Sequence, residues 1–368
     1  MRPELALFKR KRKVKHTALA LSMACLAGYA SAQSSATVYG IADTMFTKGN
    51  GSLTSKTALG SGGNMSSRFG FKGIEDLGGG MKAGFDLEAQ VFVDSGDGQP
   101  TNTNNQTTGT SSTSTGFTFA RRSTVSLHGA VGELRIGRDF TAHYRNRVEV
   151  DPFGNASVGA IQPFAGSIGG PISTRASNMI GYFLPTNANG IYGQVQYYLG
   201  ENASGTAQSD DGTGLTARVG YRNGPVNVSL ATGRTKYATT ATAGDIETTN
   251  AGVQYQIGNF RLMSGVYRDV VKRIAPLTAE GWTVGGILTT GGGDLKIAIS
   301  QYGTDAKGEP TAKKVSLGYV KNLSKRTALY TTWARVSNSG GLAAALSGAT
   351  TAANTSSTGY DFGIRHQF

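Results

Sequence analysis

The sequence has little of what usually stabilises a secreted domain or performs catalysis. Its single cysteine, Cys25, excludes an internal disulfide framework. No apolar run beyond the first 32 residues approaches the roughly 18 residues of a membrane-spanning helix. The sequence shows no nucleophile elbow, no Walker A loop and no Cys/His/carboxylate cluster typical of zinc. We therefore expect no enzyme, no cofactor and no metal site, with stability supplied by packing and backbone hydrogen bonds.

The first 32 residues have the pattern of a secretory signal peptide. Its basic residues are Arg2, Lys9, Arg10, Lys11, Arg12, Lys13 and Lys15. An apolar stretch over 17–28 follows, and Ala30-Ser31-Ala32 supplies a small-residue cleavage site. We expect export through the secretory pathway, cleavage after Ala32 and a mature chain of residues 33–368.

This leader accounts for much of the apparent basicity. It holds seven of the 36 basic residues and one of the 23 acidic residues, so the remainder carries 29 and 22. Its formal net charge is therefore +7 rather than +13. Much of the excess of basic residues therefore belongs to the signal peptide and not to a nucleic-acid-binding surface. No nucleic-acid partner is expected.

Glycine is abundant, and it accompanies a strict two-residue alternation. The chain has 53 glycines in 368 residues, about twice the usual share. Residues 67–92 read "SRFGFKGIEDLGGGMKAGFDLEAQVF", with apolar and charged residues alternating on both sides of a turn at 75–80. No segment reads as an amphipathic helix that would cover the apolar face of a soluble sheet. The pattern therefore favours a transmembrane β-barrel.

Connections of two lengths follow one another along the chain. The short ones are 75–80, 128–132, 184–190, 222–225, 257–260, 290–294 and 321–326. The long polar ones run roughly over 48–65, 94–116, 140–177, 200–213, 237–246, 272–280, 303–310 and 337–357. Seven short and eight long connections predict sixteen antiparallel strands, with turns in the periplasm and loops outside the cell.

A barrel in lipid has to close, because an open edge would leave backbone groups unpaired in hydrocarbon. The first strand, 37–46, is thus expected to pair with the last, "GYDFGIRHQF" (359–368). The residues assigned to the lipid side of the last strand are Tyr360, Phe362, Ile364, His366 and Phe368, with His366 at the periplasmic interface. Those assigned to the lumen are Asp361, Arg365 and Gln367.

Four segments carry a family resemblance. They are "SSATVYGIADTMF", "SSRFGFKGIEDLGGGMKAGFDLE", "ARRSTVSLHGAVGELRIGRDF" and the terminal "GIRHQF". They resemble the general diffusion porins of Gram-negative bacteria, particularly the β-proteobacterial branch. The resemblance implies a sixteen-stranded outer-membrane barrel, a homotrimer, and a third loop folded into the lumen. It also implies that the strand ending in Phe368 is the signal read by the outer-membrane insertion machinery.

The third loop is the longest connection, at about 140–177. A segment this long is usually functional or disordered. Its two Pro-Phe pairs (152–153 and 163–164), with Ile161 and Ile168, favour a packed loop inside the lumen over a disordered external one.

By resemblance, Arg68, Arg121 and Arg175 match the basic wall of the pore constriction. Arg138 and Lys72 are further members. Arg122 is an alternative to Arg121, because alternation in "RRSTVSL" does not decide which of the two points inward.

The acidic side of the constriction differs from the family pattern. A Pro-Glu-Phe-Gly-Gly stretch usual in the third loop is replaced by "QPFAGSIGG", which has no glutamate between Pro163 and Phe164. The nearby acids are Asp139, Glu149 and Asp151. Losing the opposing carboxylate makes the field in a narrow neck more positive, so we expect anion preference. In the alternative interpretation, the arginines only pair with wall acids such as Asp86 and Glu88.

Two other functions stay open at this point. A substrate-specific porin would line its neck with aromatic side chains, for which Tyr144, Phe153 and Phe164 are candidates. A surface adhesin or structural barrel would use the polar loop at 95–116 but would have no use for the arginines. The expected partners are two further copies of the chain, outer-membrane lipid, small ions and hydrophilic solutes, and the insertion machinery during biogenesis.

Overall fold

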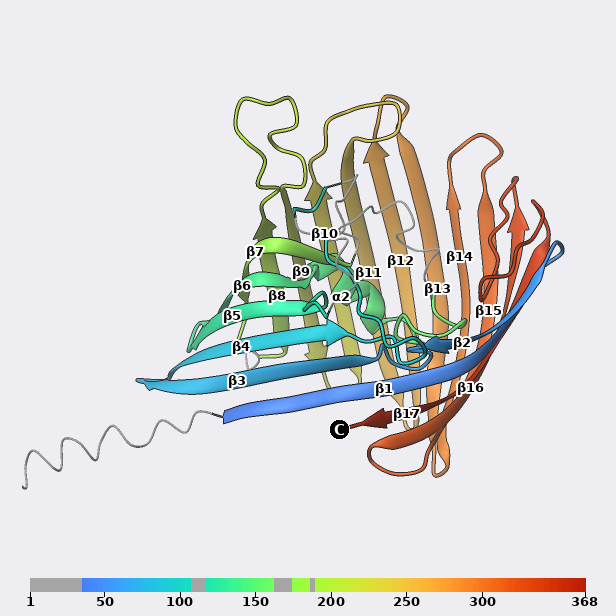
Figure 1. Ribbon diagram of the computed structural model, residues 1–368, viewed down its shortest axis with the longest axis horizontal. Helices are drawn as coiled ribbons and strands as arrows, with labels where there is room; N and C mark the ends of the chain where they lie inside the picture. Colours follow the sequence, from blue (N-terminus) through green and yellow to red (C-terminus); the bar gives the residue numbers. More distant parts are fainter. Residues whose placement is uncertain (1–34, 103, 107–116, 162–173, 186–188) are drawn as a thin grey trace, which may run out of the picture.

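A computed structural model describes residues 35–102, 104–106, 117–161, 174–185 and 189–368. The expected signal peptide, residues 1–32, lies outside them. The described chain is almost entirely antiparallel sheet, with one helix inside the ring of strands (Figure 1). The elements are β1 (Ser35–Asn50), β2 (Ser55–Ser61), β3 (Arg68–Gly78), β4 (Met81–Gln90), β5 (Arg122–Gly129), β6 (Gly132–Phe140), α2 (Ala142–Glu149), β7 (Arg175–Phe183), β8 (Ile191–Tyr198), β9 (Gly214–Asn223), β10 (Val226–Thr235), β11 (Asp245–Ile257), β12 (Phe260–Lys272), β13 (Leu277–Thr290), β14 (Gly293–Thr304), β15 (Thr311–Asn322), β16 (Thr327–Ser339) and β17 (Ser356–Gln367).

The sheet closes through the expected pairing of its first and last strands. β1 and β17 run antiparallel in a register that places Ile41 opposite Gln367. Beyond the strand, Gly40 and Phe368 exchange two backbone hydrogen bonds of 3.1 Å. The ring of Phe368 occupies the space that a Cβ at residue 40 would take, so a side chain there would displace the ring. The carboxyl-terminal residue is therefore part of the barrel seam.

Two of the seventeen labelled strands form a single wall strand. β2 pairs with β1 over residues 44–50, and β3 pairs with β1 over residues 35–41. The two are separated by a break at residues 62–67, so the closed barrel has sixteen wall strands, as expected. The long polar connection predicted roughly over 48–65 is shorter in the structure, because β1 extends to Asn50 and β2 lies within the predicted range.

Asp43 of β1 holds this break in place. Its buried carboxylate accepts hydrogen bonds from the backbone N–H groups of Gly63 (3.1 Å), Asn64 (3.0 Å) and Met65 (2.7 Å), and from the Tyr330 hydroxyl. These bonds replace the ladder pairing that the break removes.

Apolar side chains on alternate positions face outward. On β14, Leu295, Ile297 and Ile299 are 40–47% exposed, whereas the intervening Ala298 is only 2% exposed. An apolar exterior of this kind is costly in water and favourable in a bilayer. On β17, Asp361 is buried on the inner side, and the outward Phe362 is exposed.

His366 lies at the short-turn end of β17. Its Nδ1 is 3.0 Å from the Oγ1 of Thr327, the first residue of β16. The ring thus lies at the end of the barrel wall, and its location at the periplasmic interface stays a prediction.

The long connection after β6 contains a helix that the sequence did not predict. α2 follows Thr141, which makes no side-chain cap, and ends before Val150. The eight-residue helix carries few apolar residues, so it shows no amphipathic pattern. No helix in the described part of the chain is long and apolar enough to cross a membrane.

Beyond α2, this third loop reaches the opposite wall. The backbone N–H of Val158 donates to Asp361 Oδ2 on β17 (2.7 Å), and Lys314 Nζ on β15 donates to the carbonyl of Ala160. Ile161 is buried in an apolar cluster with Leu346. The loop therefore crosses the lumen from β6 to β15 and β17, as a packed loop would. Pro163, Phe164 and Ile168 lie outside the described residues.

Candidate functional site

A group of arginines gathers on the wall formed by β3 to β7, beside the start of α2, a helix that packs against β8 to β11. This arginine cluster consists of Arg68, Arg121, Arg122, Arg135, Arg138, Arg145 and Arg175. Five of its members come from β3, β5, β6 and β7, Arg121 directly precedes β5, and Arg145 lies in α2.

Two carboxylates of β4 bind part of this cluster. Glu88 is buried and accepts a hydrogen bond from Arg121 Nε at 2.6 Å, and its other oxygen lies 3.6 Å from Arg68 Nη1. The Tyr39 hydroxyl is 2.9 Å from Asp86 and 3.2 Å from Glu88. These contacts fix the two acids on the inner face of β4.

Both Arg121 and Arg122 point to this inner face. Arg122 Nη1 donates to Asp86 at 2.6 Å, and its Nε donates to Asp139 at 3.0 Å. Arg121 precedes the first residue of β5 and so escapes the strand's alternation. The structure thus keeps both candidates, and it places them in pairs with wall acids, as the alternative interpretation expected.

Asp139 lies among the arginines rather than opposite them. It is fully buried and binds Arg122, Arg135 and Arg145, the last with 3.1 Å between Arg145 Nη2 and Asp139 Oδ2. The pairing of β6 with β7 shifts by one residue just before Asp139, where Gly137 adopts a φ of 125°. The expectation that Asp139 would face the basic wall across the constriction is corrected accordingly.

The other two expected acids have local partners. Glu149 forms an ion pair with Arg218 of β9. Asp151 is buried and accepts hydrogen bonds from the backbone N–H groups of Phe153 (2.9 Å) and Asn155 (3.0 Å). Burial raises the pKa of Asp151, and the backbone donors oppose that shift. Among the described residues, neither acid pairs with the arginine cluster, and their place on an acidic side of the constriction stays a prediction.

Arg138 and Arg175 have no carboxylate partner among the described residues. Arg138 donates to the Ala120 carbonyl and the Ser177 hydroxyl, both at 2.7 Å. Arg175 Nε donates to the Arg121 carbonyl at 3.1 Å. The partners are neutral, so both guanidinium charges remain uncompensated by a direct ion pair within the described chain.

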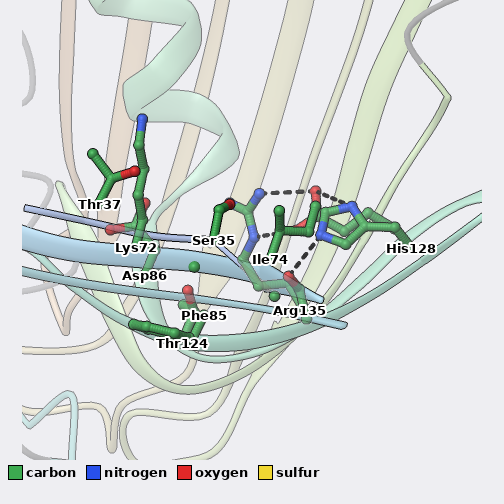
Figure 2. A pocket seen from close by; sticks show the side chains of 13 residues that line it. Ser35, Thr37, Lys72, Ile74, Phe85, Asp86, Thr124, His128 and Arg135 are labelled. Carbon is green, nitrogen blue, oxygen red and sulfur yellow. Dashed lines mark hydrogen bonds and ion pairs between the residues drawn. The ribbon is translucent and has the colours of Figure 1, made fainter. Parts of the chain in front are cut away.

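A cavity of about 300 Å³ opens below the cluster, toward the short turns. In Figure 2, Arg135 and His128 stand close together in a network through Glu133, with Arg135 Nε 2.8 Å from Glu133 Oε1. Lys72 lies apart from this network, and its ammonium is 5.2 Å from the centre of the Tyr39 ring. The cavity lining is mixed in charge, because Lys72 and Arg135 lie there with Asp86 and Glu133.

The sequence reasoning missed three members of this site. Arg135 was detectable, because outward Leu134 and Ile136 flank it in "ELRIG". Arg145 was hidden by the unpredicted helix. Phe140, whose ring centre lies 4.3 Å from the Arg175 guanidinium, was not identifiable, since this contact joins two segments distant in sequence.

The aromatic candidates for a substrate-specific neck lie in different environments. Tyr144 stacks on Phe140 beside the cluster, with ring centres 5.3 Å apart. Phe153 is 3% exposed and packs against Ala160 and Ala298, so it is unavailable to a solute. Phe164 lies outside the described residues.

Comparison with known proteins places this barrel in a family. A family model described as "Gram-negative porin" matches residues 17–341. The chain belongs to this family. The porin is 34% identical over 370 residues to outer membrane porin protein 32 of Delftia acidovorans, a match that covers 96% of this chain and 100% of the relative. An outer membrane porin protein of Bordetella pertussis is 26% identical over 424 residues, and that match covers 96% of this chain and 100% of the relative.

A solved structure agrees with the fold of this porin. The anion-selective porin from Comamonas acidovorans is 32% identical, with a TM-score of 0.81 over 91% of this chain and 100% of that one. Family and fold together identify an outer-membrane channel, and they favour a channel over an enzyme.

Proposed function

We propose that this porin is a water-filled channel for passive diffusion of small hydrophilic solutes, with preference for anions. The observation that carries the preference is the pair Arg138 and Arg175, whose charges no described carboxylate balances. Fixed charge of one sign beside a narrow aqueous path raises the local concentration of the opposite ion. The likeness to a porin named for anion selectivity supports the proposal.

We further propose that the constriction lies where the third loop crosses the lumen beside the arginine cluster. The proposed basic lining is Arg68, Lys72, Arg121, Arg122, Arg138 and Arg175. The ion pairs of Arg121 and Arg122 reduce their net contribution, because Glu88 and Asp86 supply opposite charge at 2.6 Å.

Liposome swelling tests diffusion and charge preference together. Vesicles containing the porin are diluted into isotonic solutions of an organic anion, a neutral sugar and an organic cation of similar size. We expect swelling in all three, fastest with the anion. Swelling fastest with the cation would contradict anion preference, and no swelling at all would contradict a diffusion channel.

We also propose a homotrimer in outer-membrane lipid, as the family resemblance implies. The outward apolar positions supply a surface suited to lipid or to neighbouring copies. In planar bilayers, each insertion of a trimer is expected to give three correlated conductance steps. Single independent steps would contradict the trimer without affecting the proposed channel.

The carboxyl terminus is proposed to have a second role beside closing the seam. We propose that Phe368, with Tyr360, Phe362 and Ile364, forms the signal read by the insertion machinery, and that the signal peptide is removed after Ala32. Deleting Phe368 should lower assembly in cells at least tenfold but reduce folding from urea into detergent only moderately. Equal losses in both assays would indicate that Phe368 acts only through its bonds to Gly40.

A further inference from the structure

Phe140, the last residue of β6, lies at the centre of the arginine cluster. Four guanidinium groups surround its ring, with centre-to-centre distances of 4.3 Å for Arg175, 5.7 Å for Arg121, 5.8 Å for Arg145 and 6.0 Å for Arg122. These four side chains come from three different stretches of the chain. An aromatic ring therefore occupies the position where four like charges converge.

Arg175, the nearest of these guanidiniums, depends most on the Phe140 ring for its position. Arg121, Arg122 and Arg145 each have an ion pair with Glu88, Asp86 or Asp139. Arg175 has none among the described residues, and its Nε donates to a neutral carbonyl. The negative face of an aromatic ring attracts a cation without neutralising its formal charge. Phe140 can thus hold the buried Arg175 in place without adding a compensating negative charge.

A second ring extends this arrangement into the third loop. Tyr144 of α2 stacks on Phe140 at an interplanar angle of 11°, and its hydroxyl accepts a hydrogen bond from Asn155 Nδ2 at 2.8 Å. Arg147 lies 5.5 Å from the Tyr144 ring centre, and its buried Nε and Nη2 have no hydrogen-bond partner within the described ranges. The stacked pair thereby joins the β6 wall to the loop that crosses the lumen.

We propose that the Phe140–Tyr144 pair is a positioning element for ion selectivity. It holds Arg175 beside the aqueous path by cation–π attraction, in place of a carboxylate that would cancel the charge. This inference rests on the proposed anion preference and assigns part of it to two uncharged residues. Neither ring needs to contact the permeating ion.

Graded fluorination of the ring tests the proposal without changing its shape. Phenylalanine at position 140 is replaced by mono-, di- and trifluorophenylalanine, which progressively weaken the negative face. We expect the Cl⁻/K⁺ permeability ratio to fall stepwise, by about two- to fivefold overall, with little change in conductance. A ratio unaffected by fluorination would overturn the proposal.

Conventional variants supply the controls. Phe140→Leu should lower the ratio as trifluorination does, and Phe140→Tyr should keep it near wild type. Phe183→Leu is the matched control, because its ring lies 4.2 Å from Arg135, whose position Glu133 and Asp139 already fix. An equal loss in both leucine variants would contradict a specific role of Phe140. If the wild-type porin itself lacks anion preference, the proposed function fails, whereas an unchanged ratio in a selective porin refutes only the role of the ring.

Discussion

Replacing Arg138 and Arg175 together by glutamine is expected to remove most of the porin's preference for anions. At about 8 Å, a unit charge in water stabilises an anion by about 0.5 kcal/mol, and 0.1 M salt roughly halves this. The same charge destabilises a cation by the same amount, so each charge contributes twice to the difference between the two ions. Summed over the two arginines, the lost free-energy difference should lower the Cl⁻/K⁺ permeability ratio by about fivefold. Reversal potentials of the variant and the wild type in the same salt gradient give this ratio directly.

The matched control is a second double substitution that leaves net charge unchanged. Arg218→Gln combined with Glu149→Gln removes one ion pair from the same lumen. Because one positive and one negative charge are lost together, the ratio should stay within about twofold of wild type. A drop equal to that of the arginine pair would mean that loss of structure, not loss of charge, controls selectivity.

Releasing the third loop from the far wall is expected to enlarge and destabilise the open channel. Lys314→Met and Asp361→Ala remove the two charged groups that bind the backbone at Ala160 and Val158. Hydrogen bonds to charged groups contribute about 1.5–3 kcal/mol each. Losing both should shift the equilibrium between the anchored and the released loop toward release by a factor of at least about 100. Single-channel recordings should show higher conductance and greater open-channel noise.

Lys313→Met provides the comparison for that experiment. Lys313 is adjacent in sequence to Lys314 but is exposed, whereas Lys314 is buried under the loop. The control should conduct as wild type does. Unchanged conductance and noise in the double variant would show that other contacts suffice to hold the loop.

The barrel could be predicted because the sequence patterns that specify its strands and turns are local. Alternation in 81–91 and the glycine turn before it are written in consecutive residues. The break at 62–67 was not predictable in the same way. Its glycine and serine residues resemble a loop, and the acceptor that orders them, Asp43, lies about twenty residues earlier.

The site was only partly predictable for a related reason. Arginine positions could be assigned from motifs, but their partners depend on register between strands. Asp139 shares the inward face of β6 with Arg135, but the pairing of β5 with β6 brings Arg122 to it and the unpredicted helix brings Arg145. That Arg175 meets a ring rather than a carboxylate in the described structure likewise follows from what β4, β6 and α2 bring near it.

The most direct test of the account is the zero-current potential of the wild-type porin across a planar bilayer in a tenfold KCl gradient. Uncompensated guanidinium charge at the constriction predicts a potential with the sign of net chloride diffusion, shifting toward zero as salt screens the site. A potential with the sign of potassium diffusion would contradict the account.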